Sequence, residues 1–285
     1  MKIKALICIL AKLIIISLLI HIQMNFIKEI DYYPELEDDI KSLVENNKVL
    51  VIKKLPLDLN YEEYYKKIAQ KIGFFIYADE NYKTGEITPN VWTRVVYDKD
   101  KLHDTYKHSN LAQPMHTDYC YVPILDIVML ICENPAPVGG ATTFIDANVV
   151  YKLLKIYNSD LLEKVLSTDI IFGKGDNPIT TNKVAILKEE EGNYILNWSR
   201  FRISDKNDSF AKDIVKDFDY FITNYIEKMG VATNIYLQNR DAAFIRDEYV
   251  LHGRNSFLGD RCLLKGAIAY KHKKEATNVL SKIIN

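Results

Sequence analysis

One stretch of the sequence, Pro114-Met115-His116-Thr117-Asp118-Tyr119-Cys120-Tyr121, holds a histidine and an aspartate two residues apart. Side chains two residues apart leave the same face of a β-strand, so His116 and Asp118 would lie side by side. An imidazole and a carboxylate on one face are two ligands of the 2-His-1-carboxylate iron site, which leaves positions open for a cosubstrate and oxygen. The best candidate for the third ligand is His252, in Val250-Leu251-His252-Gly253-Arg254.

A His-x-Asp pattern alone is weak evidence for a metal. In many proteins the aspartate of such a pair caps a turn, and the histidine is a hydrogen-bonded surface residue. The prediction of a metal site therefore depends on the rest of the chain.

The composition is that of a globular protein, with 285 residues, 48% hydrophobic and 26% charged. A net charge of −1 argues against nucleic-acid binding, which usually needs a basic excess. The four cysteines show no CxxC spacing, so they predict neither a zinc knuckle nor a disulfide framework, and they fit a reducing compartment. We expect a cytoplasmic enzyme; the sequence does not indicate its oligomeric state.

The amino end differs from the rest of the chain. Lys2 and Lys4 precede an almost wholly apolar run, which is similar to a signal peptide or signal anchor. Lys12 interrupts the run, no small-x-small cleavage site follows, and Met24 offers an alternative start. We predict that residues 1–23 are a leader (a signal anchor or a spurious extension) and that residues 24–285 form one domain. The alternative is a membrane-anchored form, weakly tethered through residues 5–22.

The remaining pattern predicts an α+β protein. An Asn60-Tyr61-Glu62-Glu63 capping box opens one predicted helix. Periodicity and turn signals predict helices at 34–47, 60–72, 147–166 (in two pieces) and 210–229, and strands at 49–52, 91–97, 126–132, 194–202, 242–245, 249–252 and 262–270.

Four motifs in order resemble the taurine dioxygenase-like (TauD/TfdA) family of Fe(II)/2-oxoglutarate oxygenases. They are His116-Thr117-Asp118, Gly139-Gly140-Ala141-Thr142, Val250-Leu251-His252-Gly253-Arg254-Asn255-Ser256-Phe257 and Gly259-Asp260-Arg261. The last two are most similar to the trimethyllysine and γ-butyrobetaine dioxygenase branch. The chain has neither the length nor the cysteines for the amino-terminal zinc domain typical of that branch.

The resemblance implies a double-stranded β-helix, that is, a jelly-roll, cupin-like barrel with flanking helices. It implies Fe(2+) held by His116, Asp118 and His252, with 2-oxoglutarate as cosubstrate and O2 as oxidant. The implied reaction oxidises, and most often hydroxylates, a small amino-acid-like or zwitterionic substrate, with release of succinate and CO2. A carboxylate at position 118 implies oxidation and not halogenation.

The far carboxylate of 2-oxoglutarate calls for the planar, permanently charged fork that arginine supplies. Arg261 is the first candidate, with the Thr142 hydroxyl as a second donor. Arg254 is the competitor, because it would share the face of the ligand histidine if that strand continues. Its alternative role is a structural salt bridge with Asp146 or Asp247.

Several further residues are candidates for the substrate pocket. Lys265 would share a strand face with Arg261 and could meet an acid group, and tyrosines could hold an alkylammonium by cation–π contact. For each candidate the alternative is a solvated or core position. The candidates are Trp92, Arg94, Tyr119, Tyr121, Arg202 and Lys265.

Two other functions use the same residues. Two histidines and one carboxylate also bind zinc, so a zinc-dependent hydrolase is possible in principle, although no HExxH motif supplies a general base. A non-catalytic binding protein could retain the barrel, but a complete triad with Arg261 argues against it.

Overall fold

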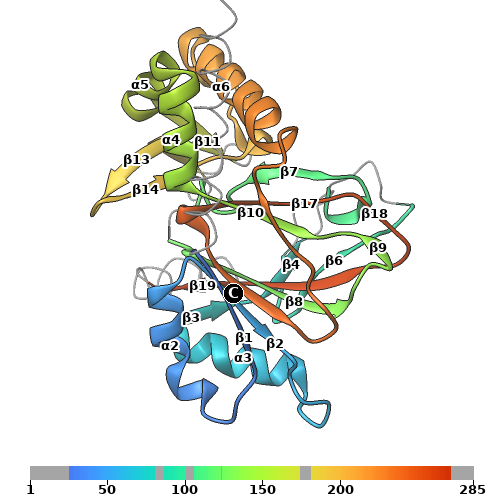
Figure 1. Cartoon of the computed structure of the whole chain (residues 1–285). Coiled ribbons are helices and arrows are strands. Elements are labelled where there is room, and N and C mark those ends of the chain that lie inside the picture. Colours follow the sequence, from blue (N-terminus) through green and yellow to red (C-terminus); the bar gives the residue numbers. More distant parts are fainter. Residues whose placement is uncertain (1–25, 81–86, 101–105, 123, 174–180, 271–285) are drawn as a thin grey trace, which may run out of the picture.

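The structure is a computed structural model, and it describes residues 26–80, 87–100, 106–122, 124–173 and 181–270. Two β-sheets lie one above the other, and helices cover the outer side of each (Figure 1). The predicted α+β class is confirmed.

The larger sheet is built around two long antiparallel strands from distant parts of the sequence. β8 pairs with β19 from Ile127↔Ile268 to Asn134↔Cys262, with a shift of register next to Cys262. In spatial order, this sheet contains β1 (Ile27–Asp31), β2 (Val49–Lys53), β16 (Ala242–Arg246), β8 (Ile127–Asn134), β19 (Cys262–Ala269) and β3 (Phe74–Ile76), and β6 (Thr93–Val96) also pairs with β19.

The smaller sheet carries the two candidate histidine ligands on adjacent strands. His252 of β17 is the cross-strand partner of His116 in β7 and of Phe144 in β10. The spatial order is β15 (Thr233–Ile235), β10 (Thr142–Asp146), β17 (Val250–Arg254) and β7 (Gln113–His116). Four two-stranded ribbons are β4 (Ala78–Glu80) with β5 (Ile87–Pro89), β9 (Val138–Gly139) with β18 (Phe257–Leu258), β11 (Asp169–Gly173) with β12 (Thr181–Ala185), and β13 (Leu187–Glu190) with β14 (Asn193–Leu196).

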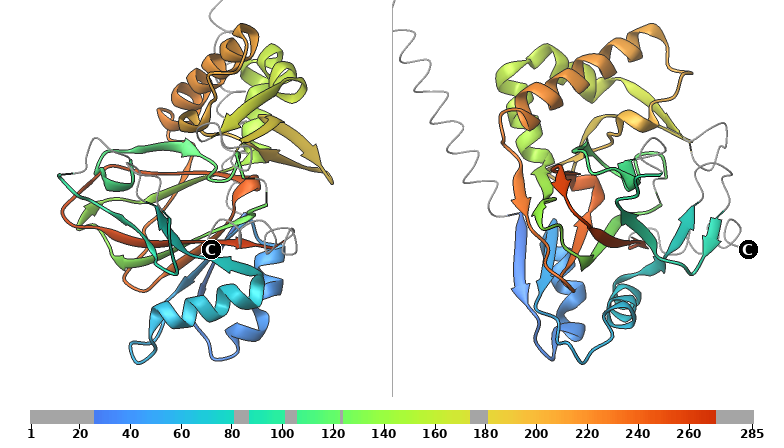
Figure 2. Two further views of the ribbon diagram at one scale, coloured as in Figure 1. Left: turned by 180° about the vertical axis from the view of Figure 1, so that it is seen from behind. Right: turned by 90° about the vertical axis from the view of Figure 1, so that its right-hand side faces the viewer.

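The helices fall into two groups. α2 (Leu36–Asn46) and α3 (Tyr61–Ile72) lie beyond the larger sheet; α4 (Ala147–Tyr157), α5 (Ser159–Ser167) and α6 (Ser209–Phe221) lie beyond the smaller one, and both further views keep this order (Figure 2). The Asn60 side chain accepts from the Glu63 backbone N–H and so begins α3 as its capping pattern predicts. Shorter turns are η1 (Tyr106–His108), η3 (Arg200–Arg202), η4 (Ile222–Glu227) and η5 (Asp247–Tyr249).

Alternating side chains divide the interior into layers. On β8, Val128 and Leu130 face the space between the sheets, whereas Ile127 and Met129 pack toward α2 and α3. A strand buried on both faces needs such a continuous apolar run. The smaller sheet does the same, since Leu251 packs into the core under α4–α6 while its neighbours face inward. Among the described residues, the polar residues of the site lie in the space between the two sheets, whereas the two outer layers under the helices are apolar.

The predicted barrel is matched in part. The described strands form two facing sheets, and no ladder of backbone hydrogen bonds joins these two sheets within the described ranges.

Two predicted elements end earlier than the sequence pattern suggests. β14 ends at Leu196, so the predicted strand over 194–202 is wrong in its second half, which forms the 3₁₀ turn η3. The chain leaves the strand because Trp198 is fully buried and its backbone N–H and C=O both bond to Thr117. The predicted helix over 210–229 changes after Phe221 into the π-helical turn η4.

The leader and the candidate tether at residues 5–22 lie outside the described residues. Across residues 26–270, wherever the structure describes them, no helix is both long and apolar enough to span a membrane.

Candidate active site

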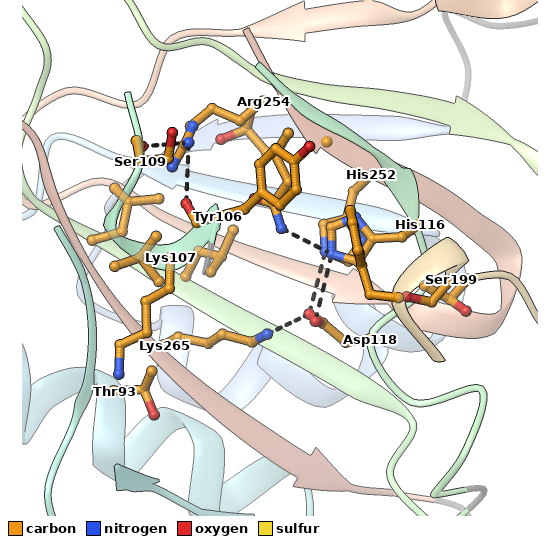
Figure 3. Close-up of a pocket in the computed structure, with 18 of the residues that line it drawn as sticks. Thr93, Tyr106, Lys107, Ser109, His116, Asp118, Ser199, His252, Arg254 and Lys265 are labelled. Atoms are coloured by element: carbon orange, nitrogen blue, oxygen red, sulfur yellow. Dashed lines mark hydrogen bonds and ion pairs between the residues drawn. The ribbon is translucent and has the colours of Figure 1, made fainter. Parts of the chain in front are cut away.

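The two histidines and the aspartate of the sequence motif meet in space, as predicted. His252 Nε2 lies 3.2 Å from Asp118 Oδ2, and His116 Nε2 lies 3.6 Å from Asp118 Oδ1 (Figure 3). One ligand atom from each of the three residues lies within 4.8 Å of the others. Asp118 lies beyond the end of β7 and not within the strand. The bend after His116 brings its carboxylate next to the two imidazole rings.

Each imidazole ring is oriented by a contact of its other nitrogen. His116 Nδ1 lies 2.9 Å from the Pro114 carbonyl oxygen, so it carries the proton and donates there. His252 Nδ1 lies 3.6 Å from Asp247 Oδ1. His116 Nε2 therefore has its lone pair free of a proton; it faces Asp118, and the Gln113 amide nitrogen lies 3.2 Å from it. His252 Nε2 faces the same carboxylate.

Asp247 supports the site from behind and was missed as a site residue by the sequence reasoning, which considered it only as a salt-bridge partner of Arg254. Its two carboxylate oxygens accept the backbone N–H groups of Asp118 (3.0 Å) and Tyr119 (2.8 Å). The same carboxylate faces the His252 ring. One buried acid thus holds the loop of one ligand and lies next to the ring of another, a role for which the sequence holds no pattern.

The electrostatics of the site favour the protonation states that bind metal. Burial alone would raise the pKa of Asp118, but the Lys265 ammonium and the contacts with both histidines outweigh it and hold that pKa well below its usual value. Burial and the neighbouring His116 lower the pKa of His252 to about 4, so its ring is neutral. The Asp118 carboxylate and the His252 ring are therefore ready to bind a divalent cation without first releasing protons.

Lys265 occupies the open side of the triad. Its Nζ lies 2.6 Å from Asp118 Oδ2, and Figure 3 shows the ammonium pointing to that carboxylate. Lys265 shares a face with Arg261 as predicted, because Arg261, just before β19, and Leu263 and Lys265 within it all line the same cavity. In this structure the ammonium neutralises the aspartate, as a cation placed there would.

The three residues fit an iron ion. Two imidazoles and one carboxylate on one side are the donor set of the facial triad, and their ligand atoms lie close together. On the other side a cavity of about 620 Å³ gives room for further ligands. The Thr142 hydroxyl in that cavity is buried and has no hydrogen-bond partner among the described residues, as expected for a group that binds a ligand.

The two arginines of the sequence analysis both line this cavity but differ in their contacts. Arg254 Nη2 donates to the backbone carbonyls of Ser109 (2.6 Å) and Leu111 (2.9 Å), and it forms no ion pair with Asp146 or Asp247 within the described chain. Arg261 is buried, and its guanidinium has no hydrogen-bond or carboxylate partner among the residues described. Burial lowers the pKa of each arginine to about 10.

Thr142, and not its neighbour Thr143, faces the cavity. The Thr143 hydroxyl points the other way and lies 3.7 Å from Met115 Sδ. The glycine turn before Thr142 has a packing reason, because a Cβ on Gly140 (φ +73°) would lie 3.2 Å from the Arg261 side chain. A larger residue there would push the unpaired arginine aside.

The substrate candidates divide into two groups. Tyr119, Tyr121, Arg202 and Lys265 line the cavity. Trp92, just before β6, and Arg94 within it do not line the cavity; Trp92 packs against Phe75 and Tyr77, and Arg94 pairs with Glu133. The residues of β6 that face the pocket are Thr93 and Val95. The expectation that Trp92 and Arg94 face it is therefore wrong by one residue.

Comparison with known proteins agrees with this geometry. A pair of sheets around a 2-His-1-carboxylate triad defines the class of non-haem Fe(II) oxygenases. Residues 24–268 match the family model described as "Taurine catabolism dioxygenase TauD, TfdA family", and the chain belongs to this family. It is therefore an oxidoreductase, a dioxygenase that depends on Fe(II) and 2-oxoglutarate. The match is to the whole family, and the narrower resemblance to the trimethyllysine branch stays a prediction.

Solved structures with the same fold share little sequence with this chain. Asparagine oxygenase in complex with Fe(II), 2S,3S-3-hydroxyasparagine and succinate matches with a TM-score of 0.63 and 12% identity over 84% of this chain and 80% of that one. The non-heme iron oxygenase OrfP in complex with Fe and alpha-ketoglutaric acid matches with a TM-score of 0.59 and 13% identity over 86% and 87%. PvcB from Pseudomonas aeruginosa matches with a TM-score of 0.58 and 14% identity over 86% of each chain. No curated protein sequence matches.

We expect Asp247→Asn to weaken metal binding about 10- to 100-fold, the usual cost of losing a partner behind a metal ligand. The amide keeps the shape of the carboxylate but turns one acceptor into a donor, so one of the two backbone N–H groups it holds loses its partner. Titration of the variant with Co(II), followed by visible absorption, measures the effect.

Asp241→Asn is the matched control. Asp241 is equally buried and also accepts two backbone N–H groups, from Lys54 (3.2 Å) and Gln238 (2.8 Å), but it lies away from the triad. It should lose stability without losing metal affinity. Equal metal affinities in the two variants, compared at equal thermal stability, would show that Asp247 has no specific role in positioning the ligands.

Proposed function

We propose that this protein hydroxylates a small, amino-acid-like molecule, with 2-oxoglutarate as cosubstrate and succinate and CO2 as products. One observation carries the proposal. The triad and the unpaired Arg261 guanidinium line the same cavity, together with the unpartnered Thr142 hydroxyl. A dicarboxylate with one end at the metal and the other at the arginine satisfies all three features at once.

Each residue has a defined part in this proposal. His116, Asp118 and His252 would hold Fe(II), which supplies the activation of oxygen when it is bound. Asp247 orients His252 and the Asp118 loop. Apolar side chains in the cavity wall, Leu130 and Leu263, keep water away from the reacting atoms.

Arg261 is proposed as the partner of the cosubstrate's far carboxylate, with Thr142 as the second donor. A buried guanidinium without a carboxylate partner is costly, so its burial is most easily explained by an anion that binds there. Arg254 instead supports the pocket wall, because its Nη2 is directed to backbone carbonyls of the segment from Tyr106 to Leu111.

The amino-acid-like substrate is supported by fold neighbours. Their structures contain 3-hydroxyasparagine in the asparagine oxygenase and (3S)-hydroxy-L-Arg in OrfP. We further propose that the two facing sheets are the walls of a double-stranded β-helix, as in the family, and that residues 24–285 form one domain.

A zinc hydrolase would need a general base near the open side of the metal. Asp118 is the only carboxylate among the described residues that line the cavity, and it belongs to the triad. The lining therefore offers no second acid for that chemistry.

The test is the formation of succinate from 2-oxoglutarate by the iron-loaded protein. We expect slow uncoupled turnover without substrate and faster turnover with a suitable amino acid, together with a product heavier by one oxygen atom. Iron bound at one equivalent without any succinate would contradict the proposal.

A further inference from the structure

Arg202 is placed in the cavity by a turn that the sequence pattern does not show. In the predicted strand, Arg200 and Arg202 would point to the same side. The observed 3₁₀ turn η3 separates them, since three residues complete one turn. Arg200 Nη2 points away to Asp219 Oδ1 (2.9 Å) and Thr223 Oγ1 (3.2 Å), whereas Arg202 lines the cavity.

Stacking holds the Arg202 side chain in place. Its Cζ lies 4.6 Å from the centre of the Tyr121 ring. A guanidinium that lies on an aromatic face keeps its N–H groups free at the edge, where they can bind a carboxylate bidentately. Tyr121 follows Asp118 by three residues, so the loop that carries a metal ligand also positions this arginine.

Arg202 differs from the other cations that line the cavity. Lys107 pairs with Asp79, Lys265 with Asp118, Arg254 with backbone carbonyls, and Arg261 is proposed for the cosubstrate. For Arg202, the part of the chain that the structure describes supplies no acceptor and no carboxylate. Fe(II) and the 2-oxoglutarate dianion have equal and opposite formal charges, so the cavity keeps its positive excess when both are bound.

We propose that Arg202 is the specificity-determining residue of this oxygenase and binds an anionic group of the substrate, which is an amino-acid-like molecule of net negative charge. This inference rests on the proposed function and narrows its substrate class. A cationic substrate is disfavoured for two reasons. The described lining has no carboxylate outside the triad, and Arg202 already covers one face of Tyr121, the aromatic ring that was the candidate partner for an alkylammonium.

Two matched series of probes test the charge preference. They are glutamate, glutamine and lysine, and hexanoate, hexanamide and hexylamine. Binding to protein loaded with Zn(II) and saturated with 2-oxoglutarate is measured by calorimetry, so that no turnover occurs, and stimulation of succinate formation is measured with Fe(II). We expect the anion of each series to bind tightest and the amine weakest.

Arg202→Gln should weaken binding of the anions about 10- to 150-fold, the range for loss of a charged hydrogen bond. Arg200→Gln, on the same turn but directed away, should leave it unchanged, and Arg202→Glu should shift the preference toward the amines. Amines that bind as tightly as anions, no anion binding at millimolar concentration, or equal effects of Arg202→Gln and Arg200→Gln would each overturn the inference. Succinate formation without added substrate tests the proposed function separately, because charge selectivity in calorimetry does not require turnover.

Discussion

His116→Ala is expected to abolish succinate formation and to lower metal affinity by more than the 10- to 100-fold typical of outer-shell changes. The substitution removes one of three protein ligands, and its Nε2 is held toward Asp118 by the bond from Nδ1 to the Pro114 carbonyl. No other described imidazole is near enough to replace it. Co(II) titration and succinate formation, measured on the same preparation, give the two effects.

His108→Ala is the control for His116→Ala. His108 is the third histidine that the structure describes; its ring contacts the Val96 carbonyl and does not belong to the triad. It should bind metal and form succinate as the unchanged protein does. Wild-type metal affinity in His116→Ala would mean that the metal, if any, binds elsewhere.

The triad was predictable because it depends on residue types at short spacing, although Asp118 lies beyond the end of β7 and not on the strand. His-x-Asp and a distant histidine before Gly-Arg are local patterns, and β-pairing of His116 with His252 then brings them together. Asp247 was not predictable as a site residue, because its role arises from a turn that directs its oxygens to backbone N–H groups of a loop distant in sequence. One aspartate outside any motif or repeating pattern cannot be recognised as a site residue from the sequence.

For the pocket wall, the alternation of side chains along a strand predicts some of the facing residues and not others. The alternation that placed Arg261 and Lys265 on one face is correct, because the chain stays extended from Arg261 into β19 past the register shift next to Cys262. The strand predicted over 194–202 is wrong in its second half, where burial of Trp198 ends the strand before Arg200 and Arg202. The alternation argument also placed Trp92 on the wrong face, because an aromatic side chain in a strand pattern fits a core as well as a pocket, and Trp92 packs in the core. Period arguments hold only as far as the strand itself.

The second large effect separates the two arginines. Arg261→Ala should leave the three metal ligands in place and keep metal affinity, but it removes the fork for the far carboxylate of 2-oxoglutarate. Removal of one partner of a buried charge pair costs roughly 2–5 kcal/mol. We therefore expect 2-oxoglutarate to bind about 30- to 5,000-fold more weakly, at about tenfold per 1.4 kcal/mol. Arg261→Lys should recover part of this loss, because it keeps the charge without the bidentate geometry.

Arg254→Ala is the matched comparison, since both arginines are buried in the same cavity and contact the same Phe257 ring. Its Nη2 satisfies carbonyls of the segment from Tyr106 to Leu111, so its loss should lower stability by roughly 2–5 kcal/mol through unpaired acceptors and lost packing. Calorimetry of 2-oxoglutarate binding and thermal unfolding, run on both variants, gives the answer. If Arg254→Ala weakens 2-oxoglutarate binding at unchanged stability while Arg261→Ala binds it normally, the roles of the two arginines are exchanged. The contacts argue for the assignment made here, because a guanidinium that already donates to three carbonyls has fewer N–H groups left for a carboxylate than one that donates to none of the described residues.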